Sequence, residues 1–328
     1  MVNKIGYQSY VGYAEEVTFG TGVAPTGFAE YNSEGFKKEI TEKLIDAING
    51  TQHYKKRVTL DQKISGSLSF PLVPGMALRL IKNGIGDAIT QTSVTTGVYK
   101  YVFIAGITSL TSMSFECGRN TADSTSIMRY TGNVIDSIKF SANLNALLMV
   151  DVSMKGYDEV ITNSITTASY RTLNPYTFVN GSIKIGDNGS SNSLPTVDSW
   201  ALEVKNNIQE IRQIGSNKPA AFVPGMQDIT YNVSAFWNDN YLYNRFINGT
   251  TSYVYAKFDN GQTIGSTTYT NSIQFESFKC YFNGTTPNVG SATDLLKASY
   301  PIRSIWNDGS STTLLVTVIT DVATFTTS

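Results

Sequence analysis

The sequence predicts a mainly β protein built from antiparallel sheets, and three observations lead to this class. Asn-Gly pairs occur at seven places, and each pair offers two adjacent residues that accept the positive φ angles of a tight hairpin turn. Runs rich in Val, Ile, Thr, Tyr and Phe lie between these pairs. Segments with helical spacing are few and short. The Asn-Gly pairs lie at 49–50, 83–84, 180–181, 188–189, 248–249, 260–261 and 283–284.

Seven runs show the period-two alternation of apolar and polar residues that is typical of a strand with one buried face. In each run one face can enter a core while the other meets solvent or a neighbour. The runs cover residues 64–70, 110–117, 134–140, 200–204, 229–235, 272–278 and 314–318. Their spread predicts β structure in both halves of the chain.

Two short helices are predicted, one in each half. Residues 76–84 follow Pro74-Gly75 and end at an Asn-Gly pair. Residues 239–249 begin with Asp239, a typical N-cap residue, and also end at such a pair. Each segment follows closely on an alternating strand, so the order of strand, turn and short helix occurs twice. This recurrence indicates an internal duplication.

The duplication predicts two β units, residues 1–170 and 171–328, each with one short flanking helix. The best linker is the stretch 158–174, because its centre is a run of small polar residues. A second alignment of the two halves is also open, in which residues 113–117 and 132–142 correspond to residues 201–205 and 225–235.

Residues 35–48 carry an apolar side chain at every fourth position, namely at Phe36, Ile40, Leu44 and Ile48. This spacing fits an amphipathic helix. The context favours a different structure, since the Asn-Gly pair at 49–50 turns the chain and a charged, alternating stretch follows it. We therefore predict a long extended arm over about residues 29–62, with the helix as the competing interpretation.

The composition favours a structural protein over a charged catalyst. Twenty-five basic and 26 acidic side chains leave a formal net charge of −1, which argues against a protein that grips nucleic acid through a basic face. Charged residues make up 16 % of the chain, below the usual share of about 25 %. The surface must therefore consist largely of Asn, Thr, Ser, Gly and Tyr, which suits broad contact with copies of the same chain.

We expect no catalytic, cofactor-binding or metal-binding residues. The one histidine, His53, would have to serve any catalytic triad, but no nucleophile-elbow pattern accompanies it, and it is expected at a surface or interface. One His and two distant Cys give no zinc ligand pairs. Cys117 and Cys280 are expected as lone thiols, although a single bridge between them stays open. The neighbours Glu15-Glu16 are expected to be solvated charges.

No run of 18 apolar residues occurs, and the first residues contain no apolar stretch of signal-peptide length. We therefore expect a soluble, unsecreted chain with no membrane partner. Lys55-Lys56-Arg57 is the one basic run, and it is too small for a nucleic-acid footprint. We expect it to pair with acidic residues on a neighbouring subunit.

Several sequence pieces follow one another in an order that resembles a known family. The chain opens with Gly12-Tyr-Ala-Glu-Glu-Val-Thr-Phe-Gly-Thr, continues through the charged arm to Gly66-Ser-Leu-Ser-Phe-Pro, and then reads Pro74-Gly-Met-Ala-Leu-Arg-Leu-Ile. Leu110-Thr-Ser-Met-Ser-Phe-Glu and Tyr130-Thr-Gly-Asn-Val-Ile-Asp-Ser-Ile come next. From residue 10 to about 156 the chain resembles the tail tube (major tail) proteins of tailed bacteriophages. The resemblance brings no catalytic residues.

The resemblance implies a β-barrel or sandwich unit with one short flanking helix. Six such units would close a ring, and stacked rings would form a hollow tube that carries viral DNA. Two units per chain imply a ring of three chains with pseudo-sixfold symmetry, whereas an outward-decorating second half implies six chains. The implied partners are the chain itself, tape-measure, baseplate or tip, and terminator proteins, and DNA that passes without specific binding. The implied location is the virion tail, after assembly in the host cytoplasm.

Our leading hypothesis is a self-assembling tail tube subunit whose arm reaches the adjacent ring. The residues expected at this contact are Phe36, Ile40, Leu44, Ile48, His53, Lys55, Lys56 and Arg57. One alternative is the inner tube of a contractile tail or injection particle, which differs by the presence of a sheath. Another is a carbohydrate-binding virion adhesin, in which Trp200, Trp237 and Trp306 would stack on sugars. At strand spacing these tryptophans are more often core residues.

Overall fold

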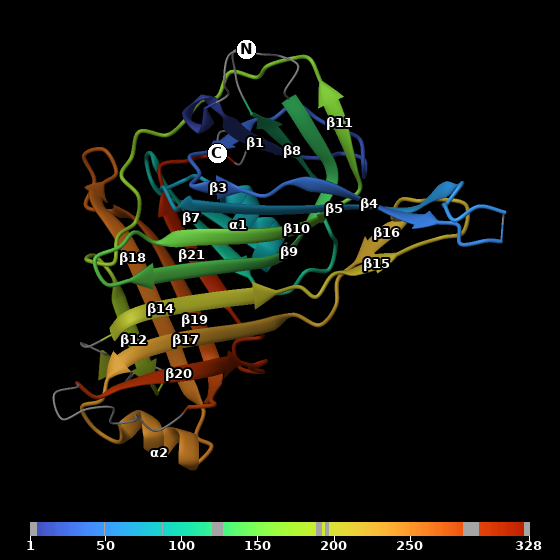
Figure 1. Ribbon diagram of the computed structural model, residues 1–328. Coiled ribbons are helices and arrows are strands. Elements are labelled where there is room, and N and C mark those ends of the chain that lie inside the picture. The colour runs from blue at the N-terminus through green and yellow to red at the C-terminus, as the bar shows by residue number, and fades with distance from the viewer. Residues whose placement is uncertain are drawn as a thin grey trace.

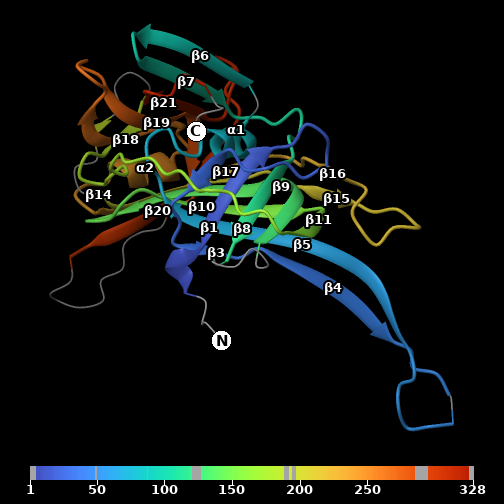
Figure 2. The same cartoon turned by 90° about the horizontal axis from the view of Figure 1, so that it is seen from above.

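Two layers of antiparallel strands cross each other and form the body of the protein (Figures 1 and 2). The computed structural model describes residues 5–48, 50–86, 88–119, 127–187, 192–193, 197–284 and 295–324. Within these residues, 19 strands belong to one hydrogen-bonded sheet and two more form a separate small hairpin. The predicted mainly β, antiparallel class is confirmed.

The front layer in Figure 1 consists of six strands, each antiparallel to the next. In spatial order they are β5 (Arg57–Pro71), β10 (Met149–Gly156), β9 (Ile127–Asn143), β14 (Val197–Lys205), β17 (Asp228–Phe236) and β20 (Lys297–Ser304). The outer side of β5 pairs with β3 (Ser33–Glu34) and β4 (Lys37–Leu44).

The back layer also follows a simple antiparallel order. Its strands are β12 (Ser182–Gly186), β18 (Ser252–Thr263), β19 (Thr270–Phe282), β21 (Leu315–Thr320), β7 (Val98–Ile104) and β6 (Ala88–Thr95). The short β13 (Asn192–Ser193) pairs with β12. The end of β19 pairs with β20 and so joins the two layers along one margin.

A third group of strands covers one end of the body, near the N-terminus in Figure 1. It runs in the order β2 (Gly27–Ala29), β1 (Tyr10–Glu15), β8 (Met113–Gly118), the first part of β9, and β11 (Asp158–Thr162). A 3-10 turn, η1 (Gly6–Gln8), precedes β1. The separate hairpin is formed by β15 (Gln209–Ile211) and β16 (Ala221–Val223).

The core lies between the layers because each strand turns its alternate apolar residues inward. The ring centroids of Phe140 on β9 and Phe275 on β19 are 4.8 Å apart. The ring centroid of Trp200 on β14 lies 5.2 Å from that of Phe258 and 5.3 Å from that of Phe275. The seven predicted alternating runs all overlap strands of the structure, and most of these strands bury alternate residues.

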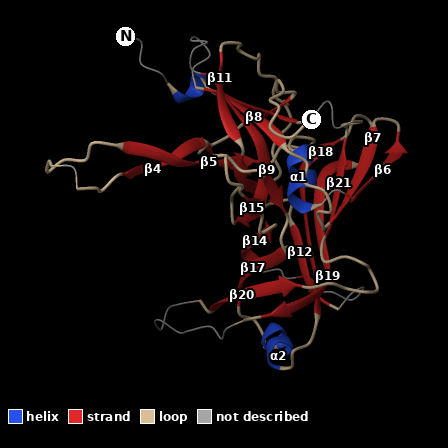
Figure 3. Ribbon diagram, turned by 90° about the vertical axis from the view of Figure 1, so that its right-hand side faces the viewer, coloured by secondary structure: helices blue, strands red, loops and turns tan. Residues whose placement is uncertain are grey.

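The two helices lie at different ends of the layers (Figure 3), and both were predicted. Helix α1 (Leu78–Ile85) is almost entirely buried, and the hydroxyl of Tyr13 accepts a hydrogen bond from Ala77 N at 3.2 Å just before it begins. Helix α2 (Tyr241–Ile247) is held by the buried Arg245, which donates to Ser252 Oγ and Asp187 Oδ1. Within the described residues no helix is long and apolar enough to span a membrane.

Side-chain amides from the second half of the chain cap the end of α1. Asn206 Nδ2 donates to the carbonyls of Gly84 and Ile135 at 3.0 and 2.9 Å. Gln227 Nε2 donates to the carbonyl of Ile85 at 2.8 Å and to Asn206 Oδ1 at 2.9 Å. The last carbonyls of a helix have no partner inside the helix, and these amides supply donors to them, in addition to Gly106 N, which also donates to the carbonyl of Ile85 at 3.1 Å.

We expect Asn206→Ala to lower the free energy of unfolding by about 1–3 kcal/mol, because two buried carbonyls would lose their donor. Denaturant unfolding followed by circular dichroism measures this loss. Asn232→Ala on the exposed face of β17 is the matched control and should change stability by less than about 0.5 kcal/mol. Equal effects of the two substitutions would contradict the capping role.

The Asn-Gly pairs predicted the correct fold class, but the hairpin turns expected at these pairs are not observed. Among the described residues, none of them forms a two-residue hairpin turn. The pair at 83–84 lies inside α1, the pair at 248–249 follows α2, and the pair at 260–261 lies in β18 where the register shifts. The pairs at 49–50 and 188–189 include residues outside the described part. The tight turn between β6 and β7 is made by Gly97, with φ of 77°.

A closed barrel, which the resemblance allowed, is not formed by the described strands. The reason is that β5 is flanked by β3 and β4, and β6 pairs with β7 alone, so the two margins of the sheet do not meet. Each layer contains strands from both halves, which meet where β14 pairs with β9 and where β21 pairs with β7. The division into units 1–170 and 171–328 therefore stays a prediction. The first residues of the predicted linker belong to β11.

The two cysteines are free and buried, so the bridge that the sequence left open is not formed. Burial raises the pKa of the Cys280 thiol to about 12 and also raises the pKa of Cys117. Thiolate forms readily only near or above the thiol pKa, so both groups are held in the unreactive form at neutral pH.

Candidate assembly surfaces

The strands β4 and β5 form a hairpin that projects beyond the body (Figure 2). Lys37 lies opposite Ser65, and Leu44 lies opposite Arg57 at the outer end. At about 3.3 Å per residue, β4 alone spans about 26 Å. Residues 37–44 are therefore a strand, and the competing helix interpretation is wrong. We call the part formed by residues 37–63 the hairpin arm and residues 45–57 its tip.

Phe36 does not belong to the exposed series in which the sequence placed it. Its side chain is buried, with ring centroids 5.1 Å from Phe115 and 5.2 Å from Tyr130. It lies at the base of the arm, where the chain still covers the core, so its partners are in its own chain. The expectation that Phe36 contacts another ring is corrected accordingly.

The other predicted contact residues are brought together on the outer part of the arm. Ile40 and Leu44 are about half exposed, and Ile48 is fully exposed. His53, Lys55, Lys56 and Arg57 are exposed as well, and Arg57 also pairs with Glu42 at 3.1 Å. The tip carries three cations and one acid, Asp46, which gives a net charge of +2 with His53 neutral. The arm thus presents apolar and basic side chains to solvent.

The small hairpin β15–β16 braces the base of the arm, and Figure 1 shows the two side by side. Gln62 N donates to the carbonyl of Asn217 at 2.9 Å, and Arg212 Nη2 donates to the carbonyl of Gln62 at 3.2 Å. Arg212 also forms ion pairs with Asp61 and Glu210. The bonds of Gln62 to Asn217 and Arg212 join residues some 150 positions apart, and no local sequence signal could have predicted them.

Asp158 at the start of β11 connects three segments at the base of the arm. Its carboxylate accepts from Lys38 Nζ at 3.0 Å and also pairs with Lys218 of the bracing hairpin. Burial acts to raise the pKa of Asp158, but the hydrogen bonds from Lys218 and Lys38 outweigh burial and lower it. The ionised carboxylate therefore stabilises this junction.

We expect the stabilising effect of Asp158 to depend on pH. Because the folded-state pKa is lower than the unfolded value of about 3.9, the effect is present above pH 4 and is lost as the pH falls through the folded pKa. Relative to wild type, Asp158→Asn should lose about 1 kcal/mol of stability at pH 7, and this difference should shrink as the pH falls below 4.

Chemical unfolding of both proteins at several pH values measures this difference. Asp46→Asn, which alters an exposed carboxylate of the tip, is the matched control and should follow the wild-type profile. A constant difference between Asp158→Asn and wild type across the pH range would show that the ion pairs do not stabilise the junction.

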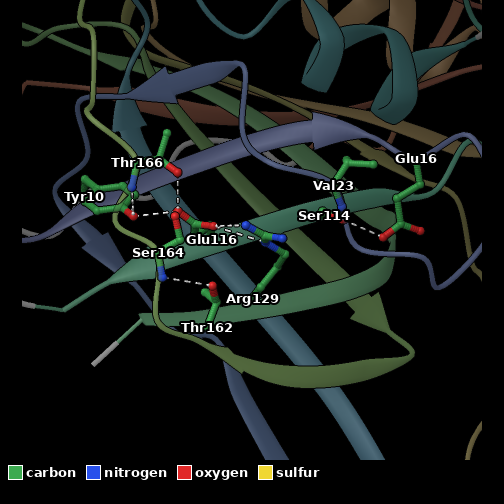
Figure 4. Close-up of polar contacts among 9 residues, drawn as sticks. All are labelled: Tyr10, Glu16, Val23, Ser114, Glu116, Arg129, Thr162, Ser164 and Thr166. Carbon is green, nitrogen blue, oxygen red and sulfur yellow. Dashed lines mark hydrogen bonds and ion pairs between the residues drawn. The ribbon is translucent and has the colours of Figure 1, made fainter. Parts of the chain in front are cut away.

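A buried carboxylate, Glu116, fastens the segment after β11 to the third group of strands (Figure 4). It accepts from Tyr10 Oη at 2.6 Å, from Arg129 Nε at 3.1 Å and from Thr166 Oγ1 at 2.8 Å. Thr166 N in turn donates to Tyr10 Oη at 3.1 Å. Burial and the bond to Glu116 raise the pKa of Tyr10 to about 12. The predicted linker is thus tied down at its centre.

Glu16 is a second buried carboxylate, contrary to the expected solvated charge. It accepts from the hydroxyls of Ser112 and Ser114 at 2.8 and 2.7 Å and from Gly132 N and Gly20 N at 2.8 and 2.9 Å. Gly20 has φ of 75°, a left-handed conformation that favours glycine. The opening motif Glu-Glu-Val-Thr-Phe-Gly-Thr therefore has a structural role, because the hydrogen bonds to Glu16 fix the loop after β1.

The tryptophans that could serve a carbohydrate-binding surface differ in their exposure to solvent. Trp200 is buried between the layers and cannot stack on a sugar, whereas Trp306 is half exposed and donates to Asp308 at 3.0 Å. Among the described residues, no group of three or more His, Cys, Asp or Glu is arranged to hold a metal ion.

The model of the family described as phage tail tube protein matches residues 6–304, nearly the whole chain. The match extends well beyond residue 156, where the resemblance of the sequence pieces ended, and includes both helices. No curated protein matches the chain.

Proposed function

Because this chain belongs to the family of phage tail tube proteins, we propose that it is a structural subunit of a tail tube. It assembles with copies of itself into stacked rings around a lumen through which viral DNA passes. Its other partners are the tape-measure, baseplate or tip, and terminator proteins of the tail. It is assembled in the host cytoplasm and resides in the virion.

The observation that carries this proposal is the projecting hairpin arm. Its side chains at Ile40, Leu44 and Ile48 are exposed to solvent, although burying a large aliphatic side chain is worth about 1.5–3 kcal/mol. The base of the arm is fixed by ion pairs and backbone hydrogen bonds, so the arm is held outward. Such an arm is suited to the contact with an adjacent ring.

The charge of the chain supports a conduit for DNA. Duplex DNA carries one negative charge per about 1.7 Å of its axis and would adhere to a basic wall. A chain with a net charge of −1 lacks such a general attraction. A ring of three chains with two units each and a ring of six chains both fit this proposal.

Negative-stain electron microscopy of the purified full chain at high concentration tests the proposal. We expect stacked rings or tubes, and the mass of an isolated ring by native mass spectrometry distinguishes three chains from six. A protein that remains monomeric at every concentration and ionic strength tested would contradict self-assembly.

A further inference from the structure

An open groove of about 660 Å³ lies beside η1 and the segment that joins β2 to β3. Three tyrosines, Tyr7, Tyr31 and Tyr170, line it together with Glu30, Glu34 and Arg119. The volume falls within the range of about 300–1,000 Å³ that is typical of binding sites. Glu16 and Glu116, the two buried carboxylates described above, are not among the residues that line this groove.

The charged residues of the groove leave one negative charge in excess. Arg119 donates to both carboxylate oxygens of Glu34, at 2.8 and 3.0 Å, and to the carbonyl of Phe36 at 2.9 Å. Its charge is therefore compensated within the chain. Glu30 is exposed and has no ion-pair partner among the residues that the structure describes. The groove thus combines an available carboxylate with the exposed rings of Tyr7 and Tyr170.

This combination suits a basic and apolar occupant. Tyrosine faces attract Lys and Arg side chains with about 0.5–1 kcal/mol at exposed sites, and a carboxylate adds an ion pair. The arm tip has these properties, since it carries Lys55 and Lys56 beside Arg57, which pairs with Glu42 of the same arm, together with the fully exposed Ile48. Groove and tip are therefore complementary in charge and in chemistry.

The tip cannot reach the groove of its own chain, because the arm points away from η1 and its base is braced (Figures 1 and 2). We propose that the groove receives the arm tip of a second copy, an inference that rests on the proposed function. A contact of this kind joins two different surfaces, so it is head-to-tail and can propagate through a stack of rings.

A charge exchange tests the pairing. Glu30→Lys and Lys56→Glu are each expected to raise the concentration needed for tube formation at least tenfold, and the double variant is expected to restore most of the loss. The control is Asp308→Lys, which changes an exposed acidic residue after β20, and this variant should assemble like wild type. Light scattering and negative-stain microscopy provide the readout, and circular dichroism verifies that each variant is folded.

A second measurement follows the contact directly. Because Cys117 and Cys280 are buried, cysteines placed at Tyr7 and Ile48 of one chain should give a ladder of cross-linked chains under mild oxidation, whereas a pair at Val179 and Ile48 should not. Normal tubes from Glu30→Lys, or no rescue in the double variant, would overturn the inference. Tubes formed by those variants would still support the proposed function, so the two failures are distinguishable.

Discussion

Removal of residues 44–57, with Lys43 and Val58 joined by an Asn-Gly turn, is expected to give a folded monomer that no longer forms tubes. Lys43 and Val58 lie opposite each other, so a two-residue turn can close the shortened hairpin without changing its register. The variant loses the exposed Leu44 and Ile48 and the basic run of the tip. It keeps Phe36 and the bracing contacts of Gln62 and Asp158, so the body should remain intact.

The starting point of this deletion matters because of Phe36. A deletion that begins at residue 36 would remove an aromatic side chain from the core, and its loss would cost about 3–5 kcal/mol. Failure to assemble could then result from unfolding. With the deletion confined to the outer hairpin, the free energy of unfolding should remain within about 1 kcal/mol of the wild-type value.

Size-exclusion chromatography, circular dichroism and negative-stain microscopy together measure the outcome. A finer pair of variants is Ile48→Ser at the tip and Val179→Ser at another strongly exposed position, of which only the first should impair assembly. Tubes that form normally from the shortened chain would refute the role of the arm in the contact between rings.

Strands were predictable from the sequence because their signal is local. The alternation around Phe140 and Val233 is a direct result of one buried and one exposed face. The crossing of the two layers was not predictable, because it depends on pairings such as β9 with β14 and β7 with β21 that join distant segments.

The arm shows where periodicity alone fails. A spacing of four places side chains close together on a helix, but four is also a multiple of two, so the same residues lie on one face of a strand. Ile40 and Leu44 therefore fit both structures. Only the presence of a partner strand decides between them, and that partner, the outer part of β5, follows after the turn.

The burial of the two carboxylates could not be predicted from the sequence, because it also depends on distant segments. Glu16 and Glu116 receive donors from Ser112, Gly132 and Thr166, all of which come from other segments of the chain. A charged residue is predicted to be exposed unless its partners are known, because burying an unpaired charge costs much free energy. The opening segment that contains Glu16 resembles the start of a known family, and this was the one signal that could have pointed to a structural role.

Glu116→Gln is expected to lower the free energy of unfolding by about 3 kcal/mol. The substitution keeps the size of the side chain but removes the charge that balances Arg129, whose side chain is only 20 % exposed. Removing one partner of a buried ion pair typically costs about 3–5 kcal/mol because the other charge stays buried, and the partial exposure of Arg129 places the expected loss at the lower end. Denaturant unfolding followed by tryptophan fluorescence measures this change.

The matched control is Glu203→Gln, since Glu203 pairs with Lys205 at 3.4 Å on an exposed face and should contribute less than about 1 kcal/mol. The double variant Glu116→Gln with Arg129→Met should recover part of the stability, because it removes the uncompensated charge itself. In both variants the segment held by Thr166 should become more sensitive to proteolysis, since a neutral amide oxygen accepts the Thr166 hydroxyl more weakly than the carboxylate of Glu116 does. A loss no larger than that of the control would mean that the charge of Glu116 contributes nothing that a neutral amide cannot replace.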